Sequence, residues 1–403
     1  MALIKKKRRR KVGRRRLRTR RFSTAYRQGK LDGFHRGKAD GYAQGHSNAL
    51  TATENAEPLR NVTPAVDVLV ISAGYIPSLD IGVIQPFDHM RQHGNFQFEV
   101  KLDHEVSKEM IAAAKTIVFV RNVEPAAYTL LEWAHELRKR TVYVIDDNFL
   151  EIQPTTPVGV YYSDPTIRET FTKFLRNAQI VKVDAPDLGT YIEQKINRKV
   201  VYFPASVDFD WLDEQPRHEK KNDQIVIGYE GAAKDEEFAP VVPALMKILD
   251  YYGGFVRLEF FGYVPAPLAE HPSVSYEEGG MEYKNFIQKL NMSNWDIGLA
   301  PLGDTIFHKG KTNNKMREYG ACRIAGIYSD NPVYSRWVTH GESGYLVPHT
   351  EEGWYEGLKD MIENPTLRIG IRENAEAVAR QLFSLNTCVE NWKKYILDTQ
   401  AGG

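Results

Sequence analysis

Three charged side chains in the second half of the chain have the types and the spacing of an anion-binding site. Lys311, Lys315 and Glu318 stand at positions i, i+4 and i+7 of a segment with helix-compatible composition, 311–322, so we expect them to share one helix face. Two ammonium groups near a helix N-terminus suit a diphosphate, and a carboxylate one turn later can accept two hydrogen bonds from a sugar diol. A solvated helix face with a Lys–Glu pair has the same spacing, so both interpretations stay open.

The residues before this helix predict a strand that ends beside a ligand. The run DIGLAPL, residues 296–302, is short and apolar, and Gly303 and Asp304 follow it. This is typical of a buried parallel strand that meets a loop at its carboxyl end. Open α/β sheets bind ligands at that end of their strands, so the strand, loop and helix together predict a binding site.

A longer pattern runs through the same region. Its residues are Pro301, Leu302, Asp304, Phe307, Lys311, Thr312, Lys315, Glu318, Tyr319, Ser329, Asp330, Gly341, Gly344, Tyr345, Leu346 and Val347. The pattern resembles the donor-binding region of GT-B glycosyltransferases, specifically of retaining family-4-like enzymes. The resemblance implies that the donor is bound by Asp304, Lys311, Thr312, Lys315, Glu318 and Tyr319. It also implies a retaining, metal-independent transfer with no cofactor besides the nucleotide-sugar substrate. The chain departs from the pattern at Gly310, where many of these enzymes carry a sugar-contacting glutamate, which leaves Glu318 as the expected ribose ligand.

A glycine turn near residue 224 predicts the start of the donor domain. The segment IVIGYEGAAKDEE, residues 225–237, reads as a strand that opens through Gly231 into a helix, and glycine lets the backbone approach a bound group closely. The turn resembles that of the same family, with Tyr229 in place of a tryptophan. Residues 256–265 are the expected strand beside the nucleotide base, and residues 384–398 the expected helix that returns to the first domain.

The first half of the chain alternates strand and helix patterns, as a doubly wound sheet does. Expected strands span residues 66–72, 96–102, 116–122, 141–147, 180–185 and 199–205, and expected helices span 124–140 and 166–176. Asp146 and Asp147 end one strand and Arg121 ends its neighbour. Paired carboxylates can split their pKa values, so these three residues are candidates to position an acceptor hydroxyl or to take its proton. An acidic pair that only caps or orders a loop is an equal alternative. Gly74 and Tyr75 are expected to line the same cleft.

The length of 403 residues provides material for two cores. We expect an α/β fold of two Rossmann-like doubly wound domains (GT-B), with a basic, disordered or helical N-terminal extension. The expected parts are a tail and tether at 1–60, an acceptor domain at 61–206, a linker at 207–223, a nucleotide-sugar-binding domain at 224–384 and a crossover helix at 385–403.

The net charge of +1 hides two different parts of the chain. Residues 1–50 hold 17 Lys and Arg against two Asp, whereas the remaining 353 residues hold 36 basic and 50 acidic side chains. Residues 5–21 are expected to bind an anionic partner, such as nucleic acid, a membrane surface or an acidic polymer, unless they only aid solubility or dock on the acidic body. Glycines then recur every fourth residue within 26–45, which favours self-association or docking, with a flexible linker as the equal alternative.

Composition excludes several classes of protein. The chain is 42% hydrophobic and has no apolar run near the length of a membrane span. Its two cysteines, Cys322 and Cys388, provide neither a disulfide framework nor a metal cluster, so no metal site is expected. We expect a cytoplasmic protein, located at the periphery of an anionic surface or an assembly if the tail docks there.

The sequence therefore predicts a glycosyltransferase that moves a sugar from a nucleotide-sugar donor to an unidentified hydroxyl acceptor, which is a glycan, a protein or another polymer. Two alternatives stay open. One is a non-catalytic carbohydrate- or nucleotide-binding module anchored to an assembly by its tail. The other is a nucleic-acid-modifying glycosyltransferase whose basic tail holds the substrate. The sugar, the nucleotide base, the acceptor and the oligomeric state are not specified by the sequence.

Overall fold

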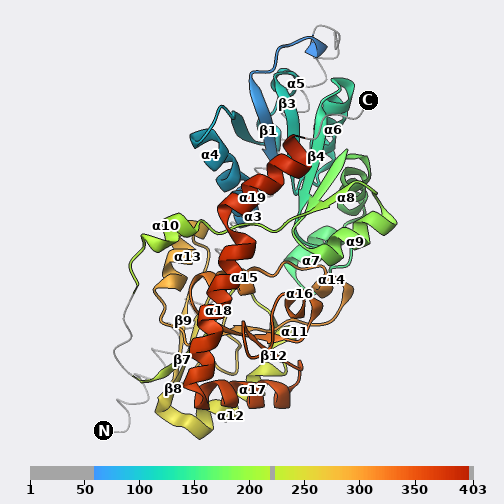
Figure 1. Ribbon diagram of the computed structural model, residues 1–403. Coiled ribbons are helices and arrows are strands. Elements are labelled where there is room, and N and C mark those ends of the chain that lie inside the picture. Colours follow the sequence, from blue (N-terminus) through green and yellow to red (C-terminus); the bar gives the residue numbers. More distant parts are fainter. Residues whose placement is uncertain (1–58, 218–222, 399–403) are drawn as a thin grey trace, which may run out of the picture.

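A computed structural model describes residues 59–217 and 223–398, which form two domains that are each built on a six-stranded parallel sheet (Figure 1). The basic segment 5–21 and the glycine repeat within 26–45 lie outside the described residues. No helix of the described ranges is long and apolar enough to cross a membrane.

The first domain alternates strands with helices from β1 to α9, and α10 follows. Its strands are β1 (Val66–Ser72), β2 (Phe98–Leu102), β3 (Ala114–Val120), β4 (Arg140–Ile145), β5 (Ile180–Val183) and β6 (Val200–Tyr202). Its helices and helical turns are α3 (Pro77–Leu79), the π-helical η1 (Asp80–Ile84), α4 (Gln85–Gln92), the 3-10 turn η2 (Asp103–Glu105), α5 (Lys108–Ala112), α6 (Pro125–Glu136), α7 (Pro157–Ser163), α8 (Pro165–Asn177) and α9 (Pro186–Lys195). Helix α10 (Phe209–Asp213) lies in the linker and packs with buried side chains of the second domain.

The second domain repeats this alternation. Its strands are β7 (Ile225–Glu230), β8 (Val256–Phe261), β9 (Val274–Glu277), β10 (Ile297–Ala300), β11 (Ala325–Ser329) and β12 (Tyr345–Val347). Its helices are α11 (Asp235–Phe238), α12 (Val241–Tyr252), the 3-10 turn η3 (Gly253–Phe255), α13 (Tyr283–Asn291), α14 (Ile306–Lys309), α15 (Asn314–Ala321), α16 (Pro332–Ser335), α17 (Glu351–Glu363) and α18 (Pro365–Phe383). The chain then ends in α19 (Leu385–Trp392) and the π-helical η4 (Lys393–Leu397).

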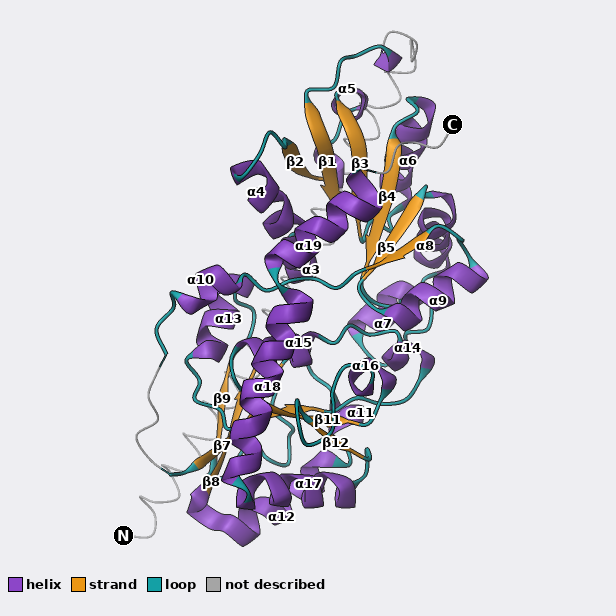
Figure 2. Cartoon of the chain, in the orientation of Figure 1, coloured by secondary structure: helices purple, strands orange, loops and turns teal. Residues whose placement is uncertain are grey.

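In both sheets the chain adds strands first on one side of an inner strand and then on the other side. The strand order is β2-β1-β3-β4-β5-β6 in the first sheet and β12-β11-β10-β7-β8-β9 in the second, with every pair parallel. Helices cover both faces of each sheet (Figure 2). Parallel strands covered on both faces must be apolar throughout, which is why β1, β3 and β10 are near-continuous apolar runs. The switch points of the two sheets lie between β1 and β3 and between β7 and β10, where open sheets of this type bind ligands.

The chain crosses between the domains at two neighbouring places. The backbone N–H of Val207 donates to the carbonyl of Phe383 at 2.8 Å, so the outgoing and returning segments run side by side. Helix α19 then packs on α4 of the first domain (Figure 1). The indole of Trp392 donates to the carbonyl of Gly82 at 2.9 Å, and its ring lies 4.8 Å from that of Phe87. The C-terminal helix is therefore part of the first domain's core.

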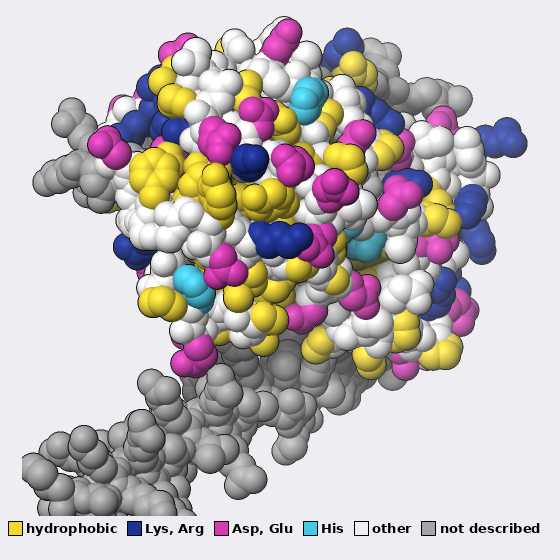
Figure 3. Space-filling model, turned by 90° about the horizontal axis from the view of Figure 1, so that it is seen from below, with side chains coloured by type: hydrophobic (Ala, Val, Ile, Leu, Met, Phe, Trp, Pro, Cys, Tyr) yellow, Lys and Arg dark blue, Asp and Glu magenta, His cyan; other side chains and the backbone are white. Residues whose placement is uncertain are grey.

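The far end of the second domain shows how the surface charges are distributed. Seen from below, acidic and basic side chains are interspersed there with hydrophobic ones (Figure 3). The acidic excess of the body is thus not gathered into a single patch on this face.

Several expected element boundaries are wrong for a local reason. Helix 124–140 ends at Glu136 because Arg138 adopts a φ of +54° before β4 starts, and strand 116–122 ends at Val120 because Arg121 has a φ of +53°. The expected helix 311–322 begins only at Asn314. Lys311 instead closes the turn after α14, with its N–H donating to the carbonyl of His308 at 3.1 Å. The supposed common helix face of Lys311, Lys315 and Glu318 therefore does not exist.

Candidate functional site

A cavity of about 450 Å³ lies between the domains at the carboxyl ends of both sheets. We call it the cleft cavity. The expected site residues that line it are Arg121, Asp146, Asp147, Gly231, Lys311, Thr312, Lys315 and Glu318. They follow the ends of β3, β4 and β7 or lie in the turn before α15 and in α15 itself, so the fold brings residues almost 200 positions apart to one place. The cavity has the size of a small-ligand site.

Three lysine ammonium groups reach this cavity, and a carboxylate holds each of them. Lys311 Nζ lies 3.4 Å from both carboxylate oxygens of Asp147, which joins the two domains. Lys315 forms an ion pair with Glu230. The third, Lys234, was not expected from the sequence; burial and the neighbouring charge of Lys311 lower its pKa to about 8. Three ammonium groups that line one cavity suit a polyanion whose oxygens replace these carboxylate partners.

The glycine turn after β7 sets the position of Lys315. Gly231 has a φ of +137°, and a Cβ added there would lie 2.9 Å from the Tyr229 hydroxyl and 3.4 Å from Lys315 Nζ. Lys315 also donates to the Glu230 carbonyl and lies over the ring of Tyr229 at 4.8 Å. Only glycine satisfies both the backbone angle and the space, so its presence allows the lysine to approach the strand end.

A histidine holds the carboxylate that pairs with Lys234. Glu237 Oε1 lies 3.6 Å from Lys234 Nζ and 3.3 Å from His308 Nε2, and His308 Nδ1 lies 2.8 Å from Thr305 Oγ1. Burial alone would raise the pKa of Glu237, but the His308 hydrogen bond and the Lys234 charge lower it to about 2. Glu237 is thus a fixed negative charge that orients Lys234.

Glu318 is a buried carboxyl group with an unusual environment. Burial and the negative charge of Glu230 raise its pKa to about 7, although Arg317 and Lys315 oppose the shift. Arg317 Nη2 lies 3.3 Å from Glu318 Oε1. Tyr283, 8% exposed, lines the same cavity, and burial and the charge of Glu318 raise the pKa of its hydroxyl. A ligand hydroxyl at this end of the cavity would meet polar partners.

The wall from the first domain differs between its two aspartates. Arg121 binds both carboxylate oxygens of Asp146 and lies over the Phe149 ring at 5.2 Å. Burial raises the pKa of Asp146, but the Arg121 charge outweighs it and the pKa is lowered. Asp146 is therefore ionised and bound to Arg121 through both oxygens. The backbone of Arg121 is in the left-handed conformation. Asp147 forms a longer ion pair, at 3.4 Å with Lys311, so it is the carboxylate that a ligand can release.

Two expected donor ligands do not line the cavity. The Asp304 side chain is 78% exposed and pairs with Lys309 at 3.0 Å. Tyr319 is buried in the core, where its hydroxyl donates to the Leu299 carbonyl at 2.8 Å and its ring fills the space next to Gly298. The surface ion pair accounts for the position of Asp304 and the core packing for that of Tyr319, and neither position supports a contact with the donor.

The remaining expected positions lie at the edges of the cleft. A Cβ at Gly310 would lie 3.2 Å from that of Asn148, so the first domain packs against this position. Tyr75 is 72% exposed and lines a neighbouring cavity, and Gly74 lines neither cavity. Within residues 59–217 and 223–398, no group of three or more His, Cys, Asp or Glu side chains is arranged to hold a metal ion.

Other residues of the cavity wall were missed. Four that carry a charge or a hydroxyl are Glu230, Lys234, Tyr283 and Asp184, the last in a buried ion pair with Lys182. Lys234 alone had a local signal, as a basic residue three positions after the turn glycine. The other three depend on contacts between distant segments.

Solved structures share this architecture. HepE of Anabaena in complex with UDP-glucose has a TM-score of 0.59 at 14% identity, covering 82% of this chain and 99% of that chain. The chain has the GT-B fold. A glycosyltransferase of Rickettsia africae matches this GT-B chain with a TM-score of 0.58 at 12% identity, covering 83% of this chain and 99% of that one. Sucrose-phosphate synthase of Thermosynechococcus elongatus has a TM-score of 0.58 at 12% identity, with 81% and 98% covered. No protein-family model matches the chain, and no curated protein matches its sequence.

Proposed function

We propose that the protein is a glycosyltransferase that takes a sugar from a nucleotide-sugar donor bound in the cleft cavity. One observation carries the proposal: the ammonium groups of Lys234, Lys311 and Lys315 converge beside the buried carboxyl of Glu318, at the carboxyl ends of two Rossmann-like sheets. Supporting it, HepE, which shares the fold, is complexed with UDP-glucose.

In this proposal each part of the donor meets a matching group. The diphosphate binds the three lysines, with the Thr312 hydroxyl and the backbone beside Gly231 within the same cavity. The ribose diol binds Glu318 in its ionised form. Each lysine exchanges its protein carboxylate for a phosphate oxygen, which returns part of the cost of breaking the ion pairs.

The proposed transfer separates charge in a way that the cavity supports. The bond between the anomeric carbon and the diphosphate oxygen breaks, its electron pair stays on the diphosphate, and the three lysines stabilise that charge. The acceptor oxygen bonds to the anomeric carbon, and its proton passes to Asp147, while Arg121 and Asp146 fix the strand end beside it. With ammonium groups in this role, we propose that transfer needs no divalent metal. We also propose that the acceptor oxygen attacks the anomeric carbon from the face that the diphosphate leaves, so that the configuration is retained as the family resemblance implies, and that the sugar is a hexose.

Donor turnover tests the proposal. The full chain is incubated with a panel of UDP-, GDP-, ADP- and TDP-hexoses, with and without EDTA, and the release of nucleoside diphosphate is followed by chromatography. We expect release from at least one donor, unchanged by EDTA and reduced at least tenfold in Lys315→Ala. A panel in which no donor is bound or consumed would refute the proposal.

A non-catalytic nucleotide- or sugar-binding module is a second candidate, because two features of the cavity favour it. Asp146 is committed to Arg121, and Gly310 stands where the resembling enzymes place a sugar-contacting glutamate. Donor binding with no release of the nucleoside diphosphate, even to water over many hours, would support this candidate. Turnover that depends on Lys315 would exclude it.

A further inference from the structure

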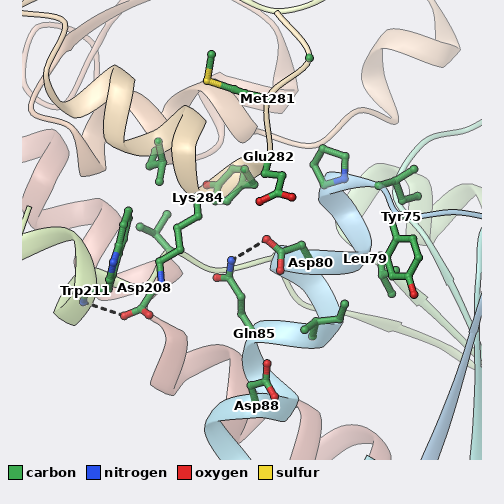
Figure 4. A pocket seen from close by; sticks show the side chains of 17 residues that line it. Tyr75, Leu79, Asp80, Gln85, Asp88, Asp208, Trp211, Met281, Glu282 and Lys284 are labelled. Atoms are coloured by element: carbon green, nitrogen blue, oxygen red, sulfur yellow. Dashed lines mark hydrogen bonds between the residues drawn. The ribbon is translucent and has the colours of Figure 1, made fainter. Parts of the chain in front are cut away.

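A second cavity of about 570 Å³ opens next to the cleft cavity. We call it the side cavity. The two cavities share the walls Ile76, Pro77, Met281 and Tyr283, so a ligand in one lies beside a ligand in the other. The side cavity is enclosed by η1 and α4 of the first domain, by the linker around α10, and by the start of α13 in the second domain (Figure 4).

Polar groups of the first domain point into this space. Figure 4 shows the Asp80 and Gln85 side chains next to each other, where Gln85 Nε2 donates to Asp80 Oδ2 at 3.0 Å. Gln85 Oε1 is buried and has no hydrogen-bond partner within residues 59–217 and 223–398. A buried acceptor without a partner carries a free-energy cost, and a ligand hydroxyl or amine relieves it once the Gln85 amide turns toward the side cavity.

The side cavity also has apolar faces suited to a sugar ring. Tyr75 is 72% exposed and Met281 is 37% exposed, and both belong to its lining. Trp211 contributes an indole, over which the Lys284 ammonium lies at 4.6 Å. Exposed aromatic and thioether groups beside hydrogen-bonding side chains form an amphipathic wall, which is the kind of surface that polyhydroxylated rings bind.

The charge of the side cavity is negative. Four carboxylates line it, those of Asp80, Asp88, Asp208 and Glu282, against the single ammonium of Lys284. The pKa of Asp80 is raised by burial and further by the charges of Asp88 and Glu282, although Gln85 and Lys284 oppose the shift. An anionic ligand would add to this repulsion, whereas a positive group would relieve it.

We propose that the side cavity is the acceptor site and that its occupant is a carbohydrate without phosphate or carboxylate groups, bound more tightly when it carries a free amino group. The inference rests on the proposed glycosyltransferase function. An acceptor must reach the donor's anomeric carbon, and it can do so because the two cavities adjoin at the residues that line both. The negative charge of the side cavity also argues against a nucleic acid as the acceptor, since every nucleotide would bring a phosphate to the carboxylates.

The test uses three p-nitrophenyl glycosides of equal ring size, those of glucose, glucosamine and glucuronic acid. Binding of each to the full chain saturated with UDP is measured by isothermal titration at low salt, and transfer is measured with the donor that the chain consumes. We expect the glucosaminide to bind most tightly and the glucuronide at least tenfold more weakly.

Charge reversal at an exposed residue measures how much the negative charge of the side cavity contributes to glucosaminide binding. Glu282 is exposed and its side chain caps no helix, so Glu282→Lys should fold normally. It should weaken glucosaminide binding about fivefold and leave UDP binding unchanged. Glu193→Lys, an equal charge change on the exposed face of α9, is the control and should change neither.

The outcomes separate the two proposals. If no nucleotide donor binds, the proposed function fails. If UDP binds but none of the glycosides does, or the glucuronide binds as well as the glucosaminide, the acceptor inference fails alone. Preferential glycosylation of a short RNA or DNA oligonucleotide would also overturn it.

Discussion

Replacing Lys315 by alanine should weaken nucleotide binding by removing one of the three charges that meet the diphosphate. Its side chain is only 11% exposed, so the lost contact is a partly desolvated, charge-assisted hydrogen bond. Such a bond contributes roughly 1.5–3 kcal/mol, which corresponds to an increase of about 10- to 150-fold in the Kd for UDP.

The same substitution also leaves Glu230 without its ion-pair partner. Glu230 is 13% exposed, so we expect a loss of about 1–3 kcal/mol in the free energy of unfolding, which urea titration measures separately. Glu230→Gln in the Lys315→Ala background removes the unpaired charge. If weak UDP binding came only from that charge, the double variant would regain affinity; we expect it to stay weak.

Isothermal titration with UDP on the full chain gives the affinities, and Lys309→Ala is the matched control. Lys309 lies in the same region but is 43% exposed, pairs with Asp304 and does not line the cavity, so its removal should change the Kd less than about twofold. A Kd for Lys315→Ala within twofold of the unmodified chain would refute the assignment of Lys315 to the diphosphate.

Four further predictions address other parts of the account. Gly231→Ala places a side chain at a φ of +137° and 2.9 Å from the Tyr229 hydroxyl, so it should weaken UDP binding at least tenfold by titration, whereas the open Gly370→Ala should not. UDP affinity should peak between pH 7 and 8, because Glu318 with a pKa of about 7 becomes ionised as the pH rises through 7, whereas Lys234 with a pKa of about 8 loses its charge above 8; a flat profile from pH 6 to 9.5 would contradict this. Trp392→Ala should cost about 3–5 kcal/mol of unfolding free energy in urea, because a fully buried indole anchors the returning helix to the first domain; a loss below 1 kcal/mol would argue against that anchoring. Deleting residues 1–50 removes 17 basic and two acidic side chains, so salt-sensitive retention on anionic vesicles or RNA should disappear while the UDP Kd stays constant; unchanged retention would end the proposed anionic partner of residues 5–21.

The sequence predicted the sheets well because parallel strands buried on both faces must be apolar. The run VDVLVIS forms β1 with the expected limits, Val66–Ser72. The ends of elements were less predictable, since they depend on single backbone angles such as that of Arg121, a residue type that does not favour positive φ.

The site was only partly predictable. The spacing of Lys311 and Lys315 left two interpretations open, and the family resemblance placed both at the donor site. The expected common helix face is wrong, because Lys311 precedes α15 and reaches the cavity from a loop. Its contact with Asp147 joins residues 164 positions apart, and no local pattern encodes that. Tyr319 matches the donor-binding pattern of the family, but its ring packs in the core against Gly298, and the local sequence does not show this contact.

The central claim is that the cleft cavity binds a nucleotide sugar through its lysines, and thermal unfolding across a panel of nucleotide sugars tests it most directly. A donor at about 100 times its Kd should add about 2.7 kcal/mol of stability and raise the Tm by roughly 3 to 4 °C. The Lys311→Ala/Lys315→Ala double variant should lose this shift while the Lys309→Ala control keeps it. A panel in which no nucleotide sugar raises the Tm, or a shift that survives in the double variant, would contradict the account.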